Sequence, residues 1–299
     1  MKHSPEPSLS PANAWPCPLC DHSSQRQFQQ HGFWIRDCQG CNHRFTEIDA
    51  SLEHVRSIYS DSYFHGGGAG YPDYLAEASL LRRHGQRYAQ LLSHYLSPGT
   101  LLDVGAAAGF ILQGFLDSGW QGRGIEPNPS MVQYAQQTLR LPVEVGTLEQ
   151  LQPSGTPEAV DLMVMIQVIA HFFDIRRAFA AASYHTKPGG FWLIETWNWH
   201  SWTARLLGKN WHEYSPPSVL HWFSPQSLAQ FATRYGFKEV GQGRPPKLIG
   251  AAHAKSLLAY KLQLLPGGKC LSHLLSPIPD QWTIPYPAED LFWILLQKQ

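Results

Sequence analysis

Four of the five cysteines lie near the start of the chain, in two closely spaced pairs. Cys17 and Cys20 form the first pair, and Cys38 and Cys41 form the second, with seventeen residues between the pairs. This C-x2-C-x17-C-x2-C spacing is typical of a zinc site, because two tight turns can close a tetrahedron of thiolates around Zn2+. Four thiolates leave no position open for water, so we expect a structural ion. Two disulfides, or unrelated thiols, are the alternative.

The segment between the cysteine pairs indicates what the metal would support. Residues 28–37 alternate between apolar and polar side chains, which predicts a short hairpin. A module over residues 1–50 buries too little surface to fold alone, so the metal would supply stability. His22 and His43 flank the pairs and could replace a thiolate, although a role outside the ligand set is the simpler interpretation. The isolated Cys270 is interpreted as a buried small apolar residue.

A second chemically suited segment is the glycine loop at 105–109. Gly105 and Gly109 follow an apolar run and precede a helical pattern. Glycines there let the backbone approach a ligand, and the N-terminus of the helix favours negative charge. Glu126 ends the next apolar run, where a carboxylate can accept both hydroxyls of an adenosine ribose. The third glycine of the dinucleotide fingerprint is absent, which disfavours a nicotinamide-binding domain.

Strands and helices must alternate to bring these residues together. Apolar runs predict strands at 101–104, 122–126, 143–145, 160–166 and 191–195, with helices at 110–115, 129–139 and 174–186 between them. Strand, helix and strand repeating at these lengths predict an α/β fold with a parallel, doubly wound sheet.

Composition restricts the classes of function. Lys and Arg number 23 and are balanced by 23 Asp and Glu, so no global field draws the protein to nucleic acid or an anionic membrane. No apolar stretch reaches the ~20 residues that span a bilayer, and residues 1–7 lack the apolar part of a secretory signal. We therefore expect a cytoplasmic protein whose thiols stay reduced.

The ordered motifs resemble those of the class I S-adenosylmethionine-dependent methyltransferases. LLDVGAAAG at 101–109 resembles their motif I, IEPNP at 125–129 their acidic second motif, and KPGG at 187–190 the turn before their fifth strand. The resemblance covers about 97–299. It implies a Rossmann-like sheet of seven mostly parallel strands with an antiparallel last strand.

The resemblance also implies roles for single residues in binding S-adenosylmethionine. Asp103, Gly105 and Gly109 would border its methionine half, Glu126 its ribose, and Gln167 its sulfonium. The full set of implied cofactor-binding residues is Tyr59, Tyr63, Asp103, Gly105, Ala106, Gly109, Phe110, Glu126, Pro127, Thr147, Leu148 and Gln167. Ala107 stands where the family has its middle glycine, a modest departure.

The chain thus divides into three predicted parts: a zinc-ribbon module at 1–50, a helical cofactor-capping segment at 51–96, and a methyltransferase domain at 97–299. Residues 236–240 and 290–296 resemble the final strand pair of that domain. The intervening 245–285 is predicted to be a helical insertion for core or dimer packing rather than for a membrane surface; its apolar positions are Leu257, Leu258, Leu262, Leu264 and Leu265.

Four further segments, at 58–64, 198–201, 206–211 and 220–224, resemble zinc-ribbon-bearing methyltransferases of natural-product and polysaccharide pathways. Residues 58–64 resemble their cofactor-capping Y-x-x-x-Y-F segment, and 220–224 resembles the segment before a late helix. Sugar C-methyltransferases in this group carry a Glu-His pair just ahead of that segment, and the His serves as base. Ser218 and Val219 stand there in this chain, which puts carbanion chemistry in doubt or moves the base elsewhere.

His171 and His221 are the candidate catalytic bases. His171 follows the fourth predicted strand, where the carboxyl ends of parallel strands gather ligands, and His221 lies just beyond the vacated pair. A histidine titrating near neutral pH suits proton removal from a hydroxyl acceptor. A structural hydrogen-bonding role is the alternative for each. The remaining candidates are Tyr63, His65, Glu195 and His200.

The function predicted is methyl transfer to a small-molecule acceptor: a sugar, a lipid-linked saccharide or a natural-product intermediate. One rival is an RNA methyltransferase, since some ribosomal RNA enzymes carry a four-ligand zinc module, but the balanced charge argues against nucleic acid. Another is a cofactor-binding scaffold without activity. The sequence does not determine the oligomeric state, and a homodimer is one possibility. Five tryptophans would suit a sugar face or an apolar acceptor, or else core packing: Trp197, Trp199, Trp202, Trp211 and Trp222.

Overall fold

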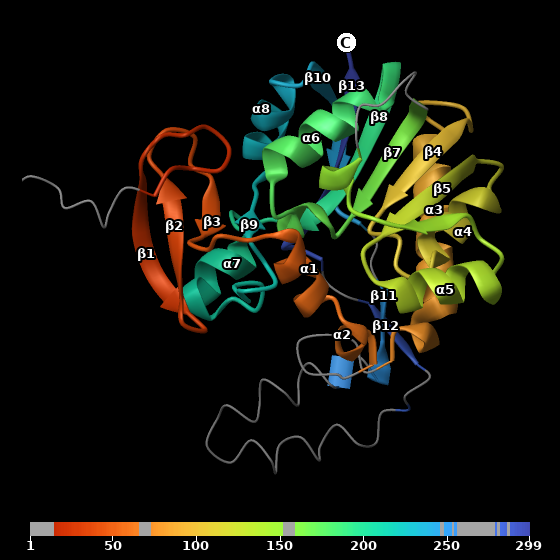
Figure 1. Ribbon diagram of the computed structural model, residues 1–299, viewed down its shortest axis with the longest axis horizontal. Helices are drawn as coiled ribbons and strands as arrows, with labels where there is room; N and C mark the ends of the chain where they lie inside the picture. The colour runs from red at the N-terminus through yellow and green to blue at the C-terminus, as the bar shows by residue number, and fades with distance from the viewer. Residues whose placement is uncertain are drawn as a thin grey trace, which may run out of the picture.

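The computed structural model describes residues 15–65, 73–151, 159–245, 248–252, 254–255, 279, 282–285 and 288–299. A small β-sheet module lies beside a larger body in which helices cover both faces of a sheet (Figure 1). Within the described ranges, no helix is both long and apolar enough to cross a membrane.

Seven strands form the large sheet, in the order β10-β13-β8-β7-β4-β5-β6. Their bounds are β4 (Thr100–Val104), β5 (Gln121–Glu126), β6 (Val143–Val145), β7 (Val160–Ile166), β8 (Thr186–Trp197), β10 (Phe237–Gly243) and β13 (Leu291–Lys298). Strands β4 to β8 pair in parallel, whereas β13 runs antiparallel to both of its neighbours. The predicted fold class, a mostly parallel seven-stranded sheet with an antiparallel last strand, is confirmed.

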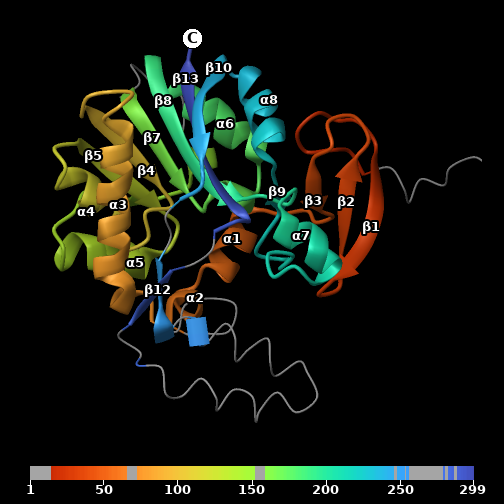
Figure 2. The same cartoon turned by 180° about the vertical axis from the view of Figure 1, so that it is seen from behind.

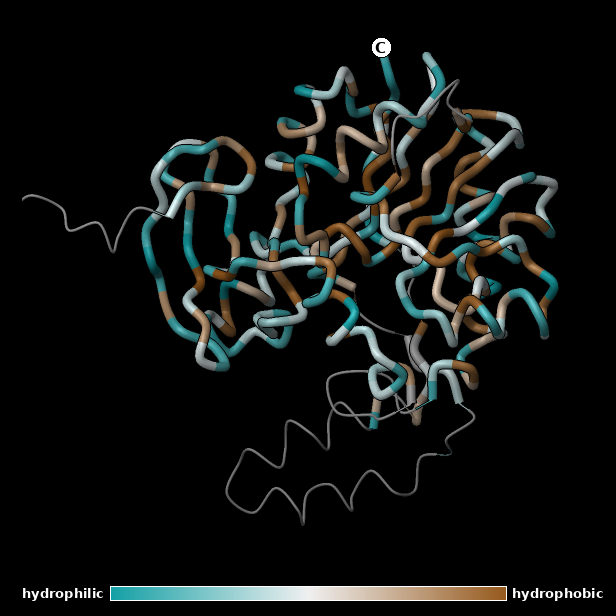
Figure 3. Tube along the Cα trace, viewed as in Figure 1, coloured by the Kyte–Doolittle hydropathy of each residue, from teal (hydrophilic) through white to brown (hydrophobic). Residues whose placement is uncertain are grey.

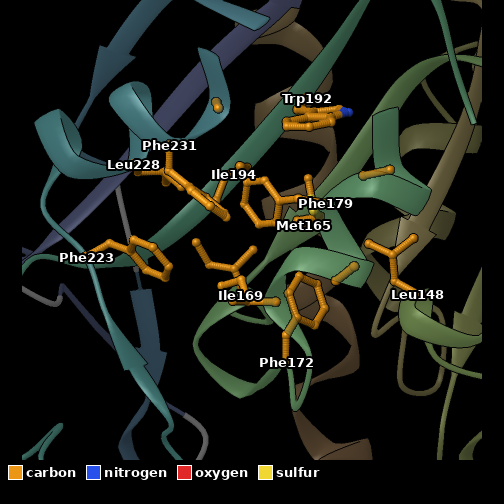
Figure 4. Packing of buried hydrophobic residues seen from close by; sticks show 14 of the residues in the cluster. Leu148, Met165, Ile169, Phe172, Phe179, Trp192, Ile194, Phe223, Leu228 and Phe231 are labelled. Atoms are coloured by element: carbon orange, nitrogen blue, oxygen red, sulfur yellow. The ribbon is translucent and has the colours of Figure 1, made fainter. Parts of the chain in front are cut away.

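Helices cover both faces of this sheet, which explains why its central strands are almost continuously apolar. Helices α3 (Ala78–Leu92), α4 (Phe110–Leu116) and α5 (Pro129–Gln137) lie on one face, and α6 (Ile175–Tyr184) and α8 (Pro225–Thr233) on the other (Figures 1 and 2). The strands form the apolar centre of the molecule in Figure 3. In Figure 4, Phe179 of α6 and Phe231 of α8 pack toward Trp192 and Ile194 of β8.

The small module is a four-stranded antiparallel sheet, β1-β2-β3-β9. The predicted hairpin is present: β1 (Ser24–Gln30) and β2 (Phe33–Cys38) join through two residues with positive φ, His31 and Gly32, as a tight hairpin turn requires. After β3 (Arg44–Thr46), the fourth strand is β9 (His221–Trp222), which follows β8 of the large sheet along the chain. A two-residue strand has no pattern of its own, so the predicted module over 1–50 did not include it.

Three short helices, α1 (Leu52–Ile58), α2 (Asp61–His65) and η2 (Leu75–Glu77), lead into α3. Ser51 caps α1 by accepting a hydrogen bond from the His54 N–H. The other short elements are η3 (Leu148–Gln150), η4 (Ile169–His171), α7 (Trp202–Leu207) and η5 (Gly208–Asn210).

Two segments differ from the prediction, and part of the second lies outside the described residues. The predicted turn at 187–190 lies inside β8, where the register with β7 shifts between Val160 and Leu162 and Gly189 has a positive φ. The described edges of the predicted insertion form an antiparallel strand pair, β11 (Leu248–Gly250) with β12 (Thr283–Pro285). The five leucines of that insertion and Cys270 lie outside the described residues.

Candidate active site

A cavity lies at the carboxyl ends of β4, β5, β7 and β8 and is also lined by residues of the segment that contains α1 and α2. Of the residues that the family resemblance implies for the cofactor, ten line this cavity: Tyr59, Tyr63, Asp103, Gly105, Ala106, Glu126, Pro127, Thr147, Leu148 and Gln167. Gly109 and Phe110 lie behind it. Gly109 begins α4 with a φ of 83°, and Phe110 stacks on Tyr74 in an aromatic cluster.

The glycine loop is held in place by the neighbouring strand. Gly105 and Ala106 both donate backbone hydrogen bonds to the Ile125 carbonyl, at 2.9 and 3.0 Å. Gly105 has a φ of 68°, and a Cβ there would come within 2.9 Å of Val168, so glycine is required on two grounds. Ala107, which stands at the family's middle glycine, also adopts a positive φ of 48°.

Glu126 is buried at the end of β5 and forms the corner of the loop. Its Oε2 accepts from the Ala107 N–H and its Oε1 from the Asn128 N–H, both at 2.9 Å. Burial raises the pKa of Glu126 to about 7, and the two backbone donors oppose that rise. The carboxylate is therefore fixed where a diol could bind, with its charge incompletely neutralised.

Two buried polar atoms of the cavity have no partner in the described part of the protein. They are Asp103 Oδ2 and Thr147 Oγ1. Burial, and secondly the charge of Glu126, raises the pKa of Asp103 to about 8. An unpaired buried oxygen costs free energy, so both atoms are suited to hydrogen-bond donors on a ligand. These residues fit an adenosine-bearing cofactor with an amino-acid tail.

The ionisable groups that line the cavity are mainly acids, and burial raises the pKa of Asp103, Glu126 and Glu149, which favours their neutral form in the empty cavity. Asp103, Glu126, Glu149 and Glu195 contribute carboxylates, and no described lining residue is Lys or Arg. Only the imidazoles among the described lining groups could carry a positive charge. A cationic ligand would stabilise the ionised form of these acids, whereas a pyrophosphate would find no Lys or Arg among the described lining residues, so the lining favours a ligand with cationic groups.

The wall between β7, β8 and α3 holds a buried network that the sequence did not reveal. Glu195 accepts hydrogen bonds from His84 Nε2 at 3.0 Å, from the Tyr88 hydroxyl, and from Gln167 Nε2 at 2.8 Å. Burial is the larger cause that raises the pKa of Tyr88, and the charge of Glu195 raises it further. His84 and Tyr88 lie on α3 without any motif around them, so only the tertiary structure connects them with the cavity.

His171 lies in the cavity with a defined orientation. Its Nδ1 is 2.7 Å from the Ser218 carbonyl oxygen, which can only accept, so Nδ1 carries the hydrogen and Nε2 has a free lone pair when the ring is neutral. Burial lowers the pKa of His171, and the backbone carbonyls of Ser218 and Gln167 oppose this. A neutral imidazole in this tautomer can accept a proton.

His221 is placed differently, outside the described lining of the cavity. Its Nε2 donates to the Phe172 carbonyl at 2.9 Å, and its Nδ1 accepts from His43 Nε2 at 3.1 Å. Burial lowers the pKa of His221 to about 4. Both ring nitrogens are thus engaged where the small module meets the large body. His200 is exposed beside Trp199, also away from the cavity.

None of the five tryptophans proposed for the acceptor lines the described cavity. Trp211 and Trp222 are buried with Tyr214 in a separate core cluster, and Trp197 and Trp199 pack against that cluster. Trp202 is 76% exposed. The alternative of core packing therefore accounts for the two buried ones. Aromatic side chains still reach the cavity, from Tyr59, Tyr63, Phe64, Tyr74 and Phe172.

The four clustered cysteines form a second site, in the small module. Their Sγ atoms all lie within 4.8 Å of one another, with contacts of 3.3, 3.4 and 3.7 Å. A tetrahedron with metal–sulfur bonds of about 2.3 Å has sulfurs about 3.8 Å apart. None of the four forms a disulfide.

Backbone amides surround these sulfurs. Cys38 Sγ accepts from the N–H groups of Gly40 and Cys41, and Cys17 Sγ accepts from that of Leu19. Hydrogen bonding from Cys17 lowers the pKa of Cys41 to about 5, whereas burial raises the pKa of Cys20 to about 11. Four such thiols can ionise together only around a cation, so the residues fit Zn2+.

Strand order, glycine loop and buried acid together define a class I methyltransferase fold. A family model described as a methyltransferase domain matches residues 79–242, more than half of the chain. The chain belongs to this methyltransferase-domain family.

Curated relatives match only parts of the chain. A ubiquinone biosynthesis O-methyltransferase from Rhodopseudomonas palustris strain BisB18 is 28% identical over 38% of this chain and 46% of its own length. One from strain HaA2 is 27% identical over 50% of this chain and 62% of its own. The chain thus spans about half the length of the curated relatives it matches.

Solved structures support the fold. The 1,6-didemethyltoxoflavin-N1-methyltransferase of Burkholderia thailandensis, solved with S-adenosylhomocysteine, has a TM-score of 0.53 at 15% identity. The match covers 92% of this chain and 99% of that one. An S-adenosylmethionine-dependent methyltransferase from Archaeoglobus fulgidus has a TM-score of 0.50 at 14% identity, covering 74% of this chain and 94% of its own.

Proposed function

We propose that this protein is an S-adenosylmethionine-dependent methyltransferase that acts on a hydroxyl group of a small molecule. The observation that carries the proposal is the acid-lined cavity at the glycine loop, with buried oxygens of Asp103 and Thr147 left unpaired. S-adenosylmethionine brings a sulfonium and an ammonium, which suit such a lining. A nicotinamide dinucleotide brings a pyrophosphate, for which the described lining offers no Lys or Arg.

Each part of the cofactor has a proposed partner in the chain. Glu126 would accept from the ribose hydroxyls, and the Gly105 backbone leaves room for the methionine half. Thr147 and Leu148 would border the adenine. Gln167, held by Glu195, would face the sulfonium. Tyr59 and Tyr63, in edge contact at 5.0 Å, would cover the cofactor from above.

Bound S-adenosylmethionine supplies an electrophilic methyl group, so the chain's own residues must orient the acceptor and remove its proton. His171 Nε2 is the proposed base, because Nδ1 donates to the Ser218 carbonyl. Burial lowers the pKa of His171, which keeps the ring neutral and able to accept a proton at neutral pH. The surrounding aromatic rings would exclude water and position the acceptor.

The acceptor belongs to one of three proposed classes: a sugar, a lipid-linked saccharide or a natural-product intermediate. The curated relatives are named ubiquinone biosynthesis O-methyltransferases, which favours oxygen as the methylated atom. The aromatic lining favours an acceptor with a flat or apolar face. We further propose that Cys17, Cys20, Cys38 and Cys41 bind one structural Zn2+, and that the protein works in the cytoplasm.

Binding and transfer can be tested separately. Calorimetry should give a saturable titration with S-adenosylhomocysteine and a much weaker one with NAD; the reverse order would refute the cofactor assignment. Radiolabelled S-adenosylmethionine should then be offered with catechol, a nucleotide-linked sugar and a lipid-linked saccharide. Label in none of the three, despite tight cofactor binding, would favour the scaffold interpretation.

A further inference from the structure

Residues 217–221, called the hub segment below, connect the small module with the cavity. They precede and include the start of β9, which pairs with β3 through Phe45 opposite His221. Figure 1 shows β9 between β3 and the large body. The segment includes Ser218 and Val219, which replace the Glu-His pair of the sugar C-methyltransferases.

On the module side, one residue of β3 holds the hub segment twice. The Thr46 N–H donates to the Leu220 carbonyl at 2.9 Å, and Thr46 Oγ1 donates to the Val219 carbonyl at 2.9 Å. Thr46 is 3% exposed, so water does not compete for these bonds. His43, two residues after Cys41, adds a third contact through its hydrogen bond to His221.

On the cavity side, the same segment determines how His171 lies. The Ser218 carbonyl accepts from His171 Nδ1 at 2.7 Å and from the Tyr59 hydroxyl at 3.3 Å. The Leu220 N–H donates to the Ala170 carbonyl at 2.8 Å, next to His171 in η4. The Pro217 carbonyl lies 2.9 Å from His54 Nε2 of α1. The hub segment therefore contacts the candidate base and the segment above the cavity.

The hub segment is positioned by its contacts with neighbouring elements. Its strand is only His221–Trp222, and a strand this short depends on its neighbour for register. The neighbour is β3, which follows directly after the second cysteine pair. The position of the Ser218 carbonyl thus depends on β3 together with η4 and α1, and β3 begins three residues after Cys41.

We propose that the small module positions the base: Thr46, acting through the hub segment, keeps the Ser218 carbonyl on His171 Nδ1 and so leaves Nε2 free to accept the proton. Thr46 is a positioning residue, and the second cysteine pair anchors it. This inference rests on the proposed function, because it assumes that His171 is the base.

The physical consequence is a change in the tautomer and pKa of His171. Free imidazole prefers neither nitrogen strongly, so a carbonyl fixed on Nδ1 selects the tautomer. The same bond stabilises the protonated ring and opposes the lowering of the His171 pKa by burial. Loosening the bond should mix the tautomers and lower the pKa further. The titratable neighbours are Tyr59, whose ring centroid lies 5.4 Å away, and His221.

Nitrogen-15 NMR of the histidine rings tests this without an acceptor. The His171 signals are assigned by their loss in His171→Asn. In Thr46→Val, which keeps the shape and the backbone bond but removes the Oγ1 donor, the Nδ1–H tautomer should lose population. The pKa of His171 should fall by about half a unit or more. Thr46→Ser should restore both values. Ser23→Ala, which removes an exposed bond to Gln39 in the same module, is the matched control and should change neither.

Metal content and S-adenosylhomocysteine affinity of each variant serve as checks of folding, and both should stay within about twofold of the wild type. A second arm needs no substitution: the wild-type protein stripped with a chelator should show the same change at His171 while it still binds S-adenosylhomocysteine. An unchanged His171 tautomer and pKa in both arms would overturn the coupling.

Failure of the coupling and failure of the proposed function are distinguishable. If His171→Asn transfers methyl at the wild-type rate to whichever of the three trial acceptors the wild-type protein methylates, the base assignment is wrong. If His171→Asn is impaired but Thr46→Val has a normal His171 titration, only the positioning role is wrong.

Discussion

The cysteine cluster and the cofactor cavity both gather ionisable side chains, but they do so in opposite ways. The four Sγ atoms come from two short turns and lie within 4.8 Å of one another, and backbone N–H groups donate hydrogen bonds to Cys17 and Cys38. The carboxylates of the cavity come from separate strands and leave buried oxygens unpaired. A closed set of like ligands suits a structural ion, whereas unpaired buried groups around an open space suit a ligand that comes and goes.

Cys17→Ser should have the largest effect and should break the cysteine cluster while the cavity still binds the cofactor. Structural Zn2+ contributes on the order of 10 kcal/mol in small zinc modules at neutral pH. The variant should lose its metal, and its first fifty residues should become sensitive to limited proteolysis. Affinity for S-adenosylhomocysteine should stay within a few fold. Cys270→Ser is the control, and equal metal content in both variants would contradict the zinc assignment.

His171→Asn should have the next largest effect, on transfer alone. A general base contributes about 10²–10⁴-fold to transfer from a hydroxyl. The rate of methyl transfer to whichever of the three trial acceptors is methylated should fall by that factor, while S-adenosylhomocysteine binds normally. His200→Asn, at an exposed histidine outside the cavity, should be neutral. A fall of less than tenfold in His171→Asn would leave the reaction to proximity or to Tyr63.

Glu126→Ala should weaken cofactor binding by about 1.5–3 kcal/mol, the worth of hydrogen bonds to a charged group. Titration calorimetry with S-adenosylhomocysteine measures this directly. Glu144→Ala, on the neighbouring strand β6 with an exposed side chain paired to Arg123, is the matched control and should bind normally. Equal affinities in the two variants would mean that the ribose does not bind at Glu126.

The smallest effect expected is a pH dependence of cofactor binding. Because burial raises the pKa of Glu126 to about 7, the group is largely protonated below that pH and accepts hydrogen bonds poorly. Affinity for S-adenosylhomocysteine should therefore rise with pH through about 7, by at most tenfold per pH unit. Glu126→Gln should flatten the profile between pH 6 and 8. An unaltered slope in this variant would assign the titration to Asp103, whose pKa is raised to about 8.

Local patterns made most of the fold predictable. The strands at 101–104, 143–145 and 160–166 and the helices around them are present at or within a few residues of their predicted bounds. They could be predicted because burial on both faces of a parallel sheet leaves a continuous apolar run in the sequence. The turn at 187–190 was misplaced because a register shift inside a strand looks like a turn when the partner strand is unknown.

The candidate sites divide in the same manner. Short covalent spacing alone brings two thiolates onto one turn, and a glycine loop directly after a strand must lie at the sheet edge, so the sequence determined the cysteine cluster and the 105–109 loop. It placed His171 ahead of His221 only by position, because His171 follows the fourth predicted strand, where the carboxyl ends of parallel strands gather ligands. Only the structure shows that both ring nitrogens of His221 are hydrogen-bonded, to His43 and to the Phe172 carbonyl, while His171 lines the cavity.

What the sequence by itself determined is therefore the inventory: a cysteine module, a methyltransferase sheet, and the residues of the glycine loop and its acid. The tertiary structure alone decided the pairing of β3 with β9, the contact of His84 and Tyr88 with Glu195, and the hydrogen bond from His171 to Ser218. The physical reason is range. Spacing and periodicity constrain neighbours along the chain, whereas these contacts join residues 47 to 178 positions apart, and folding fixes them only when distant surfaces are buried together.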